Sequence, residues 1–175
     1  MHKIYSVVDN NLDMRFFCGI ILSVFMFGGV VMQKDMALFG VQSQSIEYIN
    51  VYNSGEMRKF SKEDSGFGAV MVAFYEMMDG HHEMPAFGVS IDKEVRVSMA
   101  EGVWIEFVFD STYIHNDMPF ERLLINVQED FSGFNVVRFN NGKYEGRCFY
   151  VDLVDKKMNN LYRAIQNEIY NVNRS

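Results

Sequence analysis

The stretch VWIEFVFD, residues 103–110, alternates in the manner of a β-strand that has one apolar face and one mixed face. Successive side chains of a strand point to opposite sides of its sheet. One face would carry Val103, Ile105, Phe107 and Phe109. The other would carry Trp104, Glu106, Val108 and Asp110. A sheet of this kind has to bury its apolar face under helices, which predicts an α+β fold.

Further strands are expected on both sides of this stretch. They are residues 46–53 with a return strand at 57–60, residues 122–128, and a hairpin of 134–139 and 144–153. The hairpin has an Asn-Gly turn at Asn141 and Gly142, which is a strong signal for a tight antiparallel connection. Ser111–Phe120 is expected to be a loop. Short turns between consecutive strands predict a mostly antiparallel sheet of about five strands.

Two amphipathic helices are expected to pack on one face of this sheet. The first begins near Ser61 and ends at Asp79, with an apolar stripe of Phe67, Val70, Met71, Phe74, Met77 and Met78. The second closes the chain with a stripe of Val154, Met158, Leu161, Tyr162, Ile165 and Ile169. Residues 92–100 are compatible with a strand and with a short helix. The opposite sheet face is expected to be open to solvent or to a partner.

A hydrophobic segment, Phe16–Met32, precedes the domain and holds no charged residue. A membrane anchor needs about 17 to 25 apolar residues, so this segment is just long enough. A cleaved signal peptide and a buried core element are the alternatives. The predicted organisation is a tail at 1–15, the hydrophobic segment at 16–32, a linker at 33–45 and an α+β domain at 46–175. We expect a membrane-anchored or secreted protein, with a cytoplasmic location as the alternative.

Charge and cysteine content exclude several function classes. The formal net charge is −7, and an acidic domain repels phosphate backbones, so no nucleic-acid partner is expected. The two cysteines, Cys18 and Cys148, form neither a disulfide framework nor a metal-type pair. The sequence predicts no cofactor, no metal site and no catalytic residue.

Two similar segments use the only two prolines of the chain. His82-Glu83-Met84-Pro85 resembles the segment from His115 through Asp117 to Met118-Pro119. If both segments lie at one end of the sheet, His82, Glu83, His115 and Asp117 are candidate ligand-binding residues. Imidazole and carboxylate groups suit a divalent metal or acid/base chemistry. The alternative is two unrelated turns with exposed histidines, which is favoured because no metal-type spacing is present.

Arginines on predicted strands are a further candidate anion site. Arg122 and Arg147, together with Arg138, would bind an anion or a carboxylate of a partner if they cluster. The alternative is pairing with Glu106, Glu121 or Asp152. A carboxylate pair for hydrolysis is not expected at Glu106 and Asp110, because four residues of strand separate them by about 13 Å.

The sequence therefore predicts a non-enzymatic, extracytoplasmic binding or interaction domain. Its ligand would be a protein or a small molecule, and residues 16–32 would anchor it to a membrane. One alternative is a small metal-dependent or acid/base hydrolase that uses the two His, acid and Met-Pro segments. Another is a soluble intracellular homo-oligomer in which the hydrophobic segment is buried.

Overall fold

The computed structural model describes residues 37–172, with gaps at 86–88, at 145 and at 148. These residues belong to the second of two compact units, Asp35–Ser175. The predicted tail 1–15 and hydrophobic segment 16–32 lie outside the described residues, so the anchor hypothesis stays a prediction. Within the described part, no helix is both long and apolar enough to cross a membrane.

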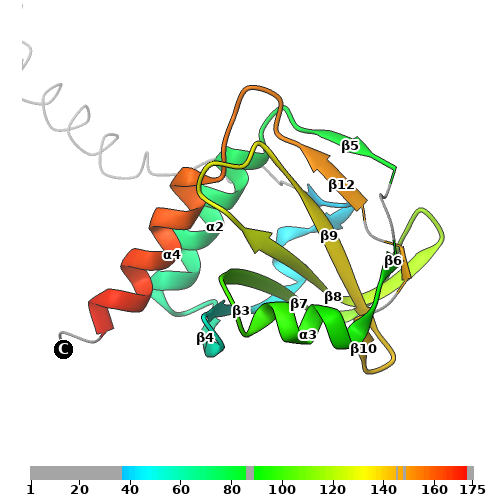
Figure 1. The fold of residues 1–175 in the computed structure, drawn as a ribbon, viewed down its shortest axis with the longest axis horizontal. Coiled ribbons are helices and arrows are strands. Elements are labelled where there is room, and N and C mark those ends of the chain that lie inside the picture. The colour runs from blue at the N-terminus through cyan, green and yellow to red at the C-terminus, as the bar shows by residue number, and fades with distance from the viewer. Residues whose placement is uncertain (1–36, 86–88, 145, 148, 173–175) are drawn as a thin grey trace, which may run out of the picture. The chain divides into compact units, whose positions relative to one another are not determined.

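An antiparallel sheet forms the centre of the described unit (Figure 1). Its strands are, in spatial order, β4 (Glu56–Ser61), β3 (Ile46–Asn53), β7 (Val103–His115), β8 (Met118–Val127), β9 (Gly133–Asn140), β12 (Phe149–Asp152) and β5 (His82–Met84). A short strand, β10 (Lys143–Tyr144), also pairs with β9. All these pairings are antiparallel. Two small ribbons are not part of its hydrogen-bonded ladder: β1 (Ala37–Leu38) with β2 (Val41–Gln42), and β6 (Val89–Ser90) with β11 (Gly146–Arg147).

The predicted α+β class and antiparallel sheet are confirmed, but the expected count of about five strands is wrong, because the sheet has eight. The edge strand β5 escaped prediction because all three of its residues are exposed. It therefore shows no alternation of apolar and polar side chains and is held by backbone pairing with β12.

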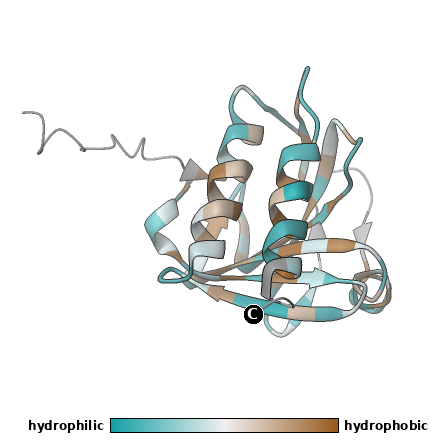
Figure 2. Ribbon diagram, turned by 90° about the vertical axis from the view of Figure 1, so that its left-hand side faces the viewer, coloured by the Kyte–Doolittle hydropathy of each residue, from teal (hydrophilic) through white to brown (hydrophobic). Residues whose placement is uncertain are grey.

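Two helices lie side by side on the apolar face of the sheet: α2 (Ser65–Met78) and α4 (Asn159–Val172) (Figures 1 and 2). Their buried side chains join those of the strands in one core: Ile49, Val51, Val70, Phe74, Phe107, Ile125, Val136, Leu161 and Ile165. The rings of Phe74 and Phe107 are 4.7 Å apart. Aromatic pairs at this distance add to the stability that burial already provides.

The first helix begins later than predicted. Ser61 closes β4, and Asp64 is the residue that precedes α2. The Asp64 carboxylate accepts hydrogen bonds from the Ser61 backbone N–H at 2.6 Å and from its hydroxyl at 2.7 Å. These bonds hold the pKa of Asp64 below its usual value. The Ser61 side chain is therefore committed to the turn before the helix.

A third helix, α3 (Asp92–Met99), covers part of the opposite sheet face, which we had expected to be open. Asp92 and Glu94 lie in its first turn, where the helix dipole favours acids, and Arg96 pairs with Asp92 at 2.9 Å. Its buried residues, Val95 and Met99, join a second cluster with Trp104, Leu124, Val137, Phe139 and Tyr144. Packing of Val95 and Met99 against the sheet therefore favours a helix over a strand for residues 92–99.

The predicted loop Ser111–Phe120 is instead the end of one strand and the start of the next. Asn116 and Asp117 form a two-residue turn with positive φ of 47° and 62°. Asn and Asp tolerate this left-handed conformation better than other residues with a side chain. The same geometry occurs at Asn141 and Gly142, where the turn was predicted correctly.

Part of the predicted linker 33–45 is packed into the core. Leu38, Phe39 and Val41 are buried, and a 3-10 turn, Ser43–Ser45, leads into β3. A bulge between Ile46 and Tyr48 then shifts the register of β3 against β7. Residues from 38 onwards therefore contribute to the same hydrophobic core as the sheet.

We predict that Leu38→Ala lowers the free energy of unfolding by about 2–5 kcal/mol, because truncation of a buried leucine leaves a cavity. Leu38 is 2% exposed. Urea unfolding followed by circular dichroism measures the change. Gln44→Ala, at an exposed position of the same segment, is the control and should change stability by about 0.5 kcal/mol or less. Equal stability of the two variants would contradict the assignment of residues 38–41 to the core.

Candidate functional site

Of the four candidate ligand-binding residues in the Met-Pro segments, the structure brings together Glu83 and His115. His115 Nε2 lies 2.7 Å from Glu83 Oε1, and Asn116 Nδ2 donates to the same oxygen at 3.2 Å. The His115 ring also packs edge-on against Phe149, with 4.8 Å between ring centres. The contacts of His115 and Asn116 with Glu83 tie the β7–β8 turn to the edge strand β5.

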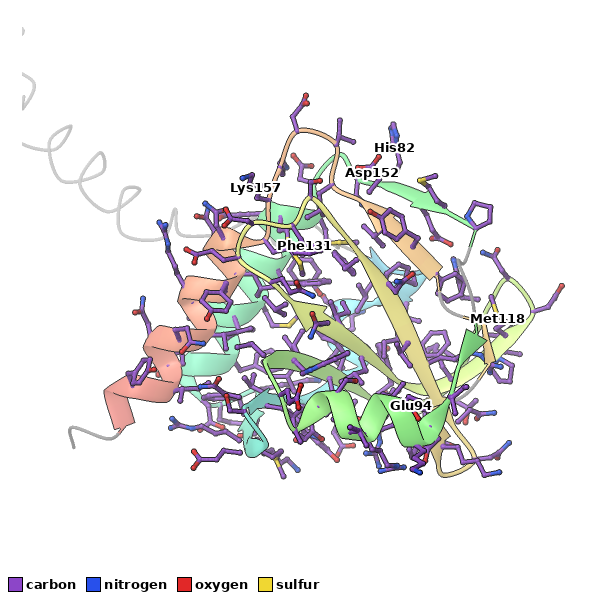
Figure 3. All side chains as sticks on the ribbon, in the orientation of Figure 1. His82, Glu94, Met118, Phe131, Asp152 and Lys157 are labelled. Atoms are coloured by element: carbon purple, nitrogen blue, oxygen red, sulfur yellow. The ribbon has the colours of Figure 1, made fainter. Side chains whose placement is uncertain are left out.

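The other two residues of that candidate site point elsewhere. His82 lies opposite Asp152 in the pairing of β5 with β12, and its exposed side chain projects outward (Figure 3). Asp117 is exposed in the β7–β8 turn. No group of three His, Cys, Asp or Glu side chains that could hold a metal ion occurs among the described residues. The contact of Glu83 with His115 connects β5 with the end of β7.

Two of the three predicted arginines, Arg122 and Arg138, have different partners. Arg122, on β8, faces Glu106, whereas Arg138 donates from Nη1 to the Pro119 carbonyl oxygen at 2.8 Å. Arg147 lies in β11, and its side chain is outside the described part of the structure. Pairing of Arg122 with Glu106 was one of the alternatives that the sequence allowed.

Glu106 is the most unusual polar residue of the sheet, because it is completely buried. Its Oε2 accepts hydrogen bonds from Asn50 Nδ2 at 2.7 Å and from the Tyr52 hydroxyl at 3.2 Å. Its Oε1 accepts one from the Tyr144 hydroxyl at 2.5 Å, and Arg122 Nη1 lies 3.6 Å away. Strands β3, β7, β8 and β10 thus meet at one carboxylate.

This environment shifts the ionisation of both tyrosines. Burial and the Glu106 carboxylate raise the pKa of Tyr52 to about 12. The same two causes raise the pKa of Tyr144 well above its usual value. Both hydroxyls therefore stay protonated at neutral pH and remain donors to Glu106.

We predict that Glu106→Ala lowers the free energy of unfolding by about 3–5 kcal/mol. Removal of the carboxylate leaves the Asn50 and tyrosine donors without an acceptor and Arg122 without its counter-charge. Urea unfolding again provides the measurement. Glu56→Ala, at an exposed position on the edge strand β4, is the matched control and should cost about 0.5 kcal/mol or less. A loss at Glu106 no larger than at Glu56 would mean that the network does not stabilise the sheet.

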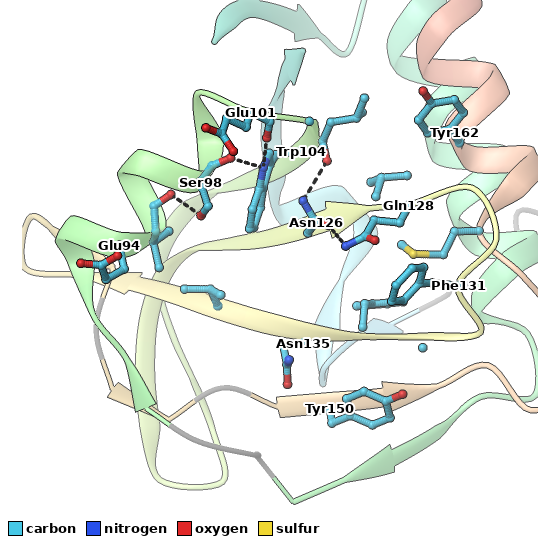
Figure 4. A pocket seen from close by; sticks show the side chains of 18 of the residues that line it. Glu94, Ser98, Glu101, Trp104, Asn126, Gln128, Phe131, Asn135, Tyr150 and Tyr162 are labelled. Carbon is cyan, nitrogen blue, oxygen red and sulfur yellow. Dashed lines mark hydrogen bonds between the residues drawn. The ribbon is translucent and has the colours of Figure 1, made fainter. Parts of the chain in front are cut away.

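A groove of about 1060 Å³ crosses the second sheet face beside α3 (Figure 4). Its α3 wall consists of Ile91, Glu94, Val95 and Ser98, which lie at helical spacing. Strands β8, β9 and β12 form the floor with Asn126, Asn135, Val137 and Tyr150. Phe131 and Tyr162 border the end near α4.

Two anchoring contacts fix the shape of the groove. The Trp104 indole N–H donates to the carbonyl oxygens of Ser98 and Glu101 at 3.1 and 3.2 Å, so the ring joins the end of α3 to the sheet. At Gly133, any Cβ would collide with the phenol of Tyr150 and with the Val151 carbonyl oxygen. Glycine at this position thus leaves room for Tyr150 to lie on the floor.

The chemistry of the groove is aromatic, amide-bearing and acidic. Phe131 is 54% exposed, and Tyr150 and Tyr162 are half-buried. Asn135 offers a side-chain amide that makes no hydrogen bond within the part of the chain that the structure describes. Glu94 and Glu101 are exposed, and no described lining residue is Lys, Arg or His. The groove therefore presents negative charge next to aromatic faces.

Sequence reasoning did not identify this groove. Of its floor residues, only Asn135 and Val137 stand two positions apart on one strand, β9, and this spacing was the available signal for a shared face. The position of α3, which makes the face concave, depends on packing between distant segments. Comparison of the chain with protein-family models, curated proteins and solved structures finds no match. The functional argument therefore rests on the geometry and charge of the site.

Proposed function

We propose that this chain is a non-enzymatic binding domain whose groove takes a basic peptide segment of a partner protein. The observation that carries the proposal is the charge of the groove. Among its described lining residues, only Glu94 and Glu101 have charged side chains, and both are acidic. A cationic segment is attracted to such a surface, whereas an anionic one is repelled. The net charge of −7 acts in the same direction at longer range.

The aromatic side chains support a cationic ligand. Ammonium and guanidinium groups bind over aromatic faces, with about 0.5–1 kcal/mol for each contact at an exposed site. Phe131, Tyr150 and Tyr162 offer such faces along the groove. The volume of about 1060 Å³ lies at the upper end of the range for organic ligands, which suits several residues of an extended peptide.

The amides favour a peptide over a simple organic cation. Asn126, Gln128 and Asn135 line the groove and combine donors with acceptors. An extended peptide presents N–H and C=O groups at regular intervals, and these amides match both kinds of group. Specificity would then come from the backbone contacts, while charge would speed association.

We predict that a capped tri-lysine peptide binds the full chain and that a capped tri-glutamate peptide does not. Trp104 is the only tryptophan and lies in the groove wall, so its fluorescence reports binding. The combined change Glu94→Gln and Glu101→Gln should weaken tri-lysine binding about tenfold, and added salt should weaken it further.

The matched control replaces two exposed acids that do not line the groove, with Glu56→Gln and Glu63→Gln. This variant has the same change in net charge and should retain most of the affinity. Equal losses in the two variants would show that net charge alone attracts the peptide. Equal binding of tri-glutamate would contradict the proposal.

The location of the domain is a further part of the proposal. We propose that Phe16–Met32 tethers the domain to a membrane and that the binding unit works outside the cytoplasm. Its support is an uncharged run of the length that spans a bilayer. The full chain should then fractionate with membranes with its N-terminus intact. A soluble chain with an intact N-terminus would contradict the tether and favour the cytoplasmic alternative.

A further inference from the structure

A second, smaller pocket lies on the other side of α3 from the groove. Its volume is about 390 Å³, and its main lining side chains are Tyr52, Arg96, Met99, Arg122, Phe139 and Tyr144. Three of these are aromatic and two are arginines. The pocket therefore differs in charge from the acidic groove, although both use the same face of the sheet.

Arg122 presents a guanidinium whose central carbon lies over the Phe139 ring, 4.4 Å from the ring centre. Its side chain is 34% exposed. The distance of 3.6 Å from Nη1 to Glu106 Oε1 is an ion pair but exceeds hydrogen-bond length. Within the described residues, the Arg122 guanidinium donates no hydrogen bond. The guanidinium N–H groups of Arg122 are therefore held in place and remain available to donate to a ligand.

Glu106 does not need the Arg122 fork to satisfy its oxygens. Asn50, Tyr52 and Tyr144 already donate three hydrogen bonds to the carboxylate. The buried negative charge beneath the pocket keeps the arginine in place, and the uncharged donors carry most of the hydrogen bonding. Arg122 is thereby positioned by one carboxylate while it retains the geometry that recognises a second one.

Arg96 adds positive charge from the α3 side. Its guanidinium lies 5.1 Å from the centre of the Tyr144 ring, and its Nε donates to Asp92 at 2.9 Å. Asp92 is itself engaged by the Tyr144 backbone N–H at 2.8 Å. Arg96 Nη2 donates to the Gly142 carbonyl oxygen at 3.4 Å. Half of the Arg96 side chain is exposed, and the residue lines the pocket.

We propose that this pocket binds a carboxylate carried by a small aromatic or aliphatic body. The carboxylate would pair with the Arg122 fork in the bidentate geometry that arginine favours, and Arg96 would contribute a second positive charge. The body of the ligand would lie against Met99 and the aromatic rings. This site is independent of the groove and of the basic peptide proposed for it.

The experiment uses the full chain and three probes of nearly equal shape: benzoate, benzamide and benzylamine. Two-dimensional NMR follows the backbone amides and the Nε–Hε signals of the arginines during each titration. We expect saturable shifts at Arg122 with benzoate and at least tenfold weaker binding of benzamide and benzylamine. The matched changes are Arg122→Lys, which keeps the charge but loses the fork, and Arg138→Lys on the adjacent strand β9.

Arg122→Lys should weaken benzoate binding about tenfold, and Arg138→Lys should leave it unchanged, because Arg138 does not line the pocket. Equal affinities for benzoate and benzamide, or equal effects of the two lysine variants, would overturn the proposal. So would shifts that map to Phe131 and Tyr162 in the groove. If Arg122→Lys disturbs the fold, Arg96→Gln decides the question: a several-fold loss supports the site, and an unchanged affinity overturns it.

Discussion

The burial of the Glu106 carboxylate constrains the whole second face of the sheet. Removing a carboxylate from water costs several kcal/mol unless hydrogen bonds and a counter-charge replace its hydration. Glu106 is 0% exposed, and its partners come from three other strands of the sheet. Those strands must therefore keep one register for all partners to reach the same carboxylate. A shift by one residue would turn each partner to the wrong face.

Helix α3 divides this face into two regions of opposite charge. Val95 and Met99 hold α3 over the second hydrophobic cluster. Glu94, on one side of the helix, lies in the groove, and Arg96, on the other, lies at the small pocket. Glu94 and Arg96 flank the buried Val95 and project to opposite sides of the helix. The eight residues of α3 thus separate an acidic surface from a basic one.

Much of the fold follows from local patterns in the sequence. The alternation at 103–110 and the stripes of α2 and α4 predict these elements because each one buries a regular face. The stripe of α4 was predicted to begin too early, because the helix begins at Asn159 and Val154 is 45% exposed. The Asn-Gly hairpin turn follows from backbone preference alone. Such patterns did not predict strands that pair through the backbone without burying side chains, such as the exposed strand β5. They also failed beyond Asp110, where exposed residues continue β7 to His115.

The candidate site was less predictable, because its parts come from segments that are distant in sequence. The pairing of Arg122 with Glu106 was an alternative that the sequence offered, and so was the approach of the two Met-Pro segments. For the groove, the local signal went no further than the shared face of Asn135 and Val137 on β9. Its wall, α3, was compatible with two secondary structures until packing against Trp104 and Leu124 decided between them. Its floor depends on the order of β8, β9 and β12 in the sheet.

The Glu106 network keeps two tyrosine hydroxyls as hydrogen-bond donors. A general acid or base works best when its pKa lies near the working pH. Burial and the Glu106 charge move both tyrosine pKa values upward, that of Tyr52 to about 12, so neither hydroxyl is poised to give up its proton near neutrality. Each hydroxyl is also committed to Glu106 as a hydrogen-bond donor. The network links four strands at one carboxylate, and such preorganisation would lower the entropic cost of binding the ligands that we propose on either side of α3.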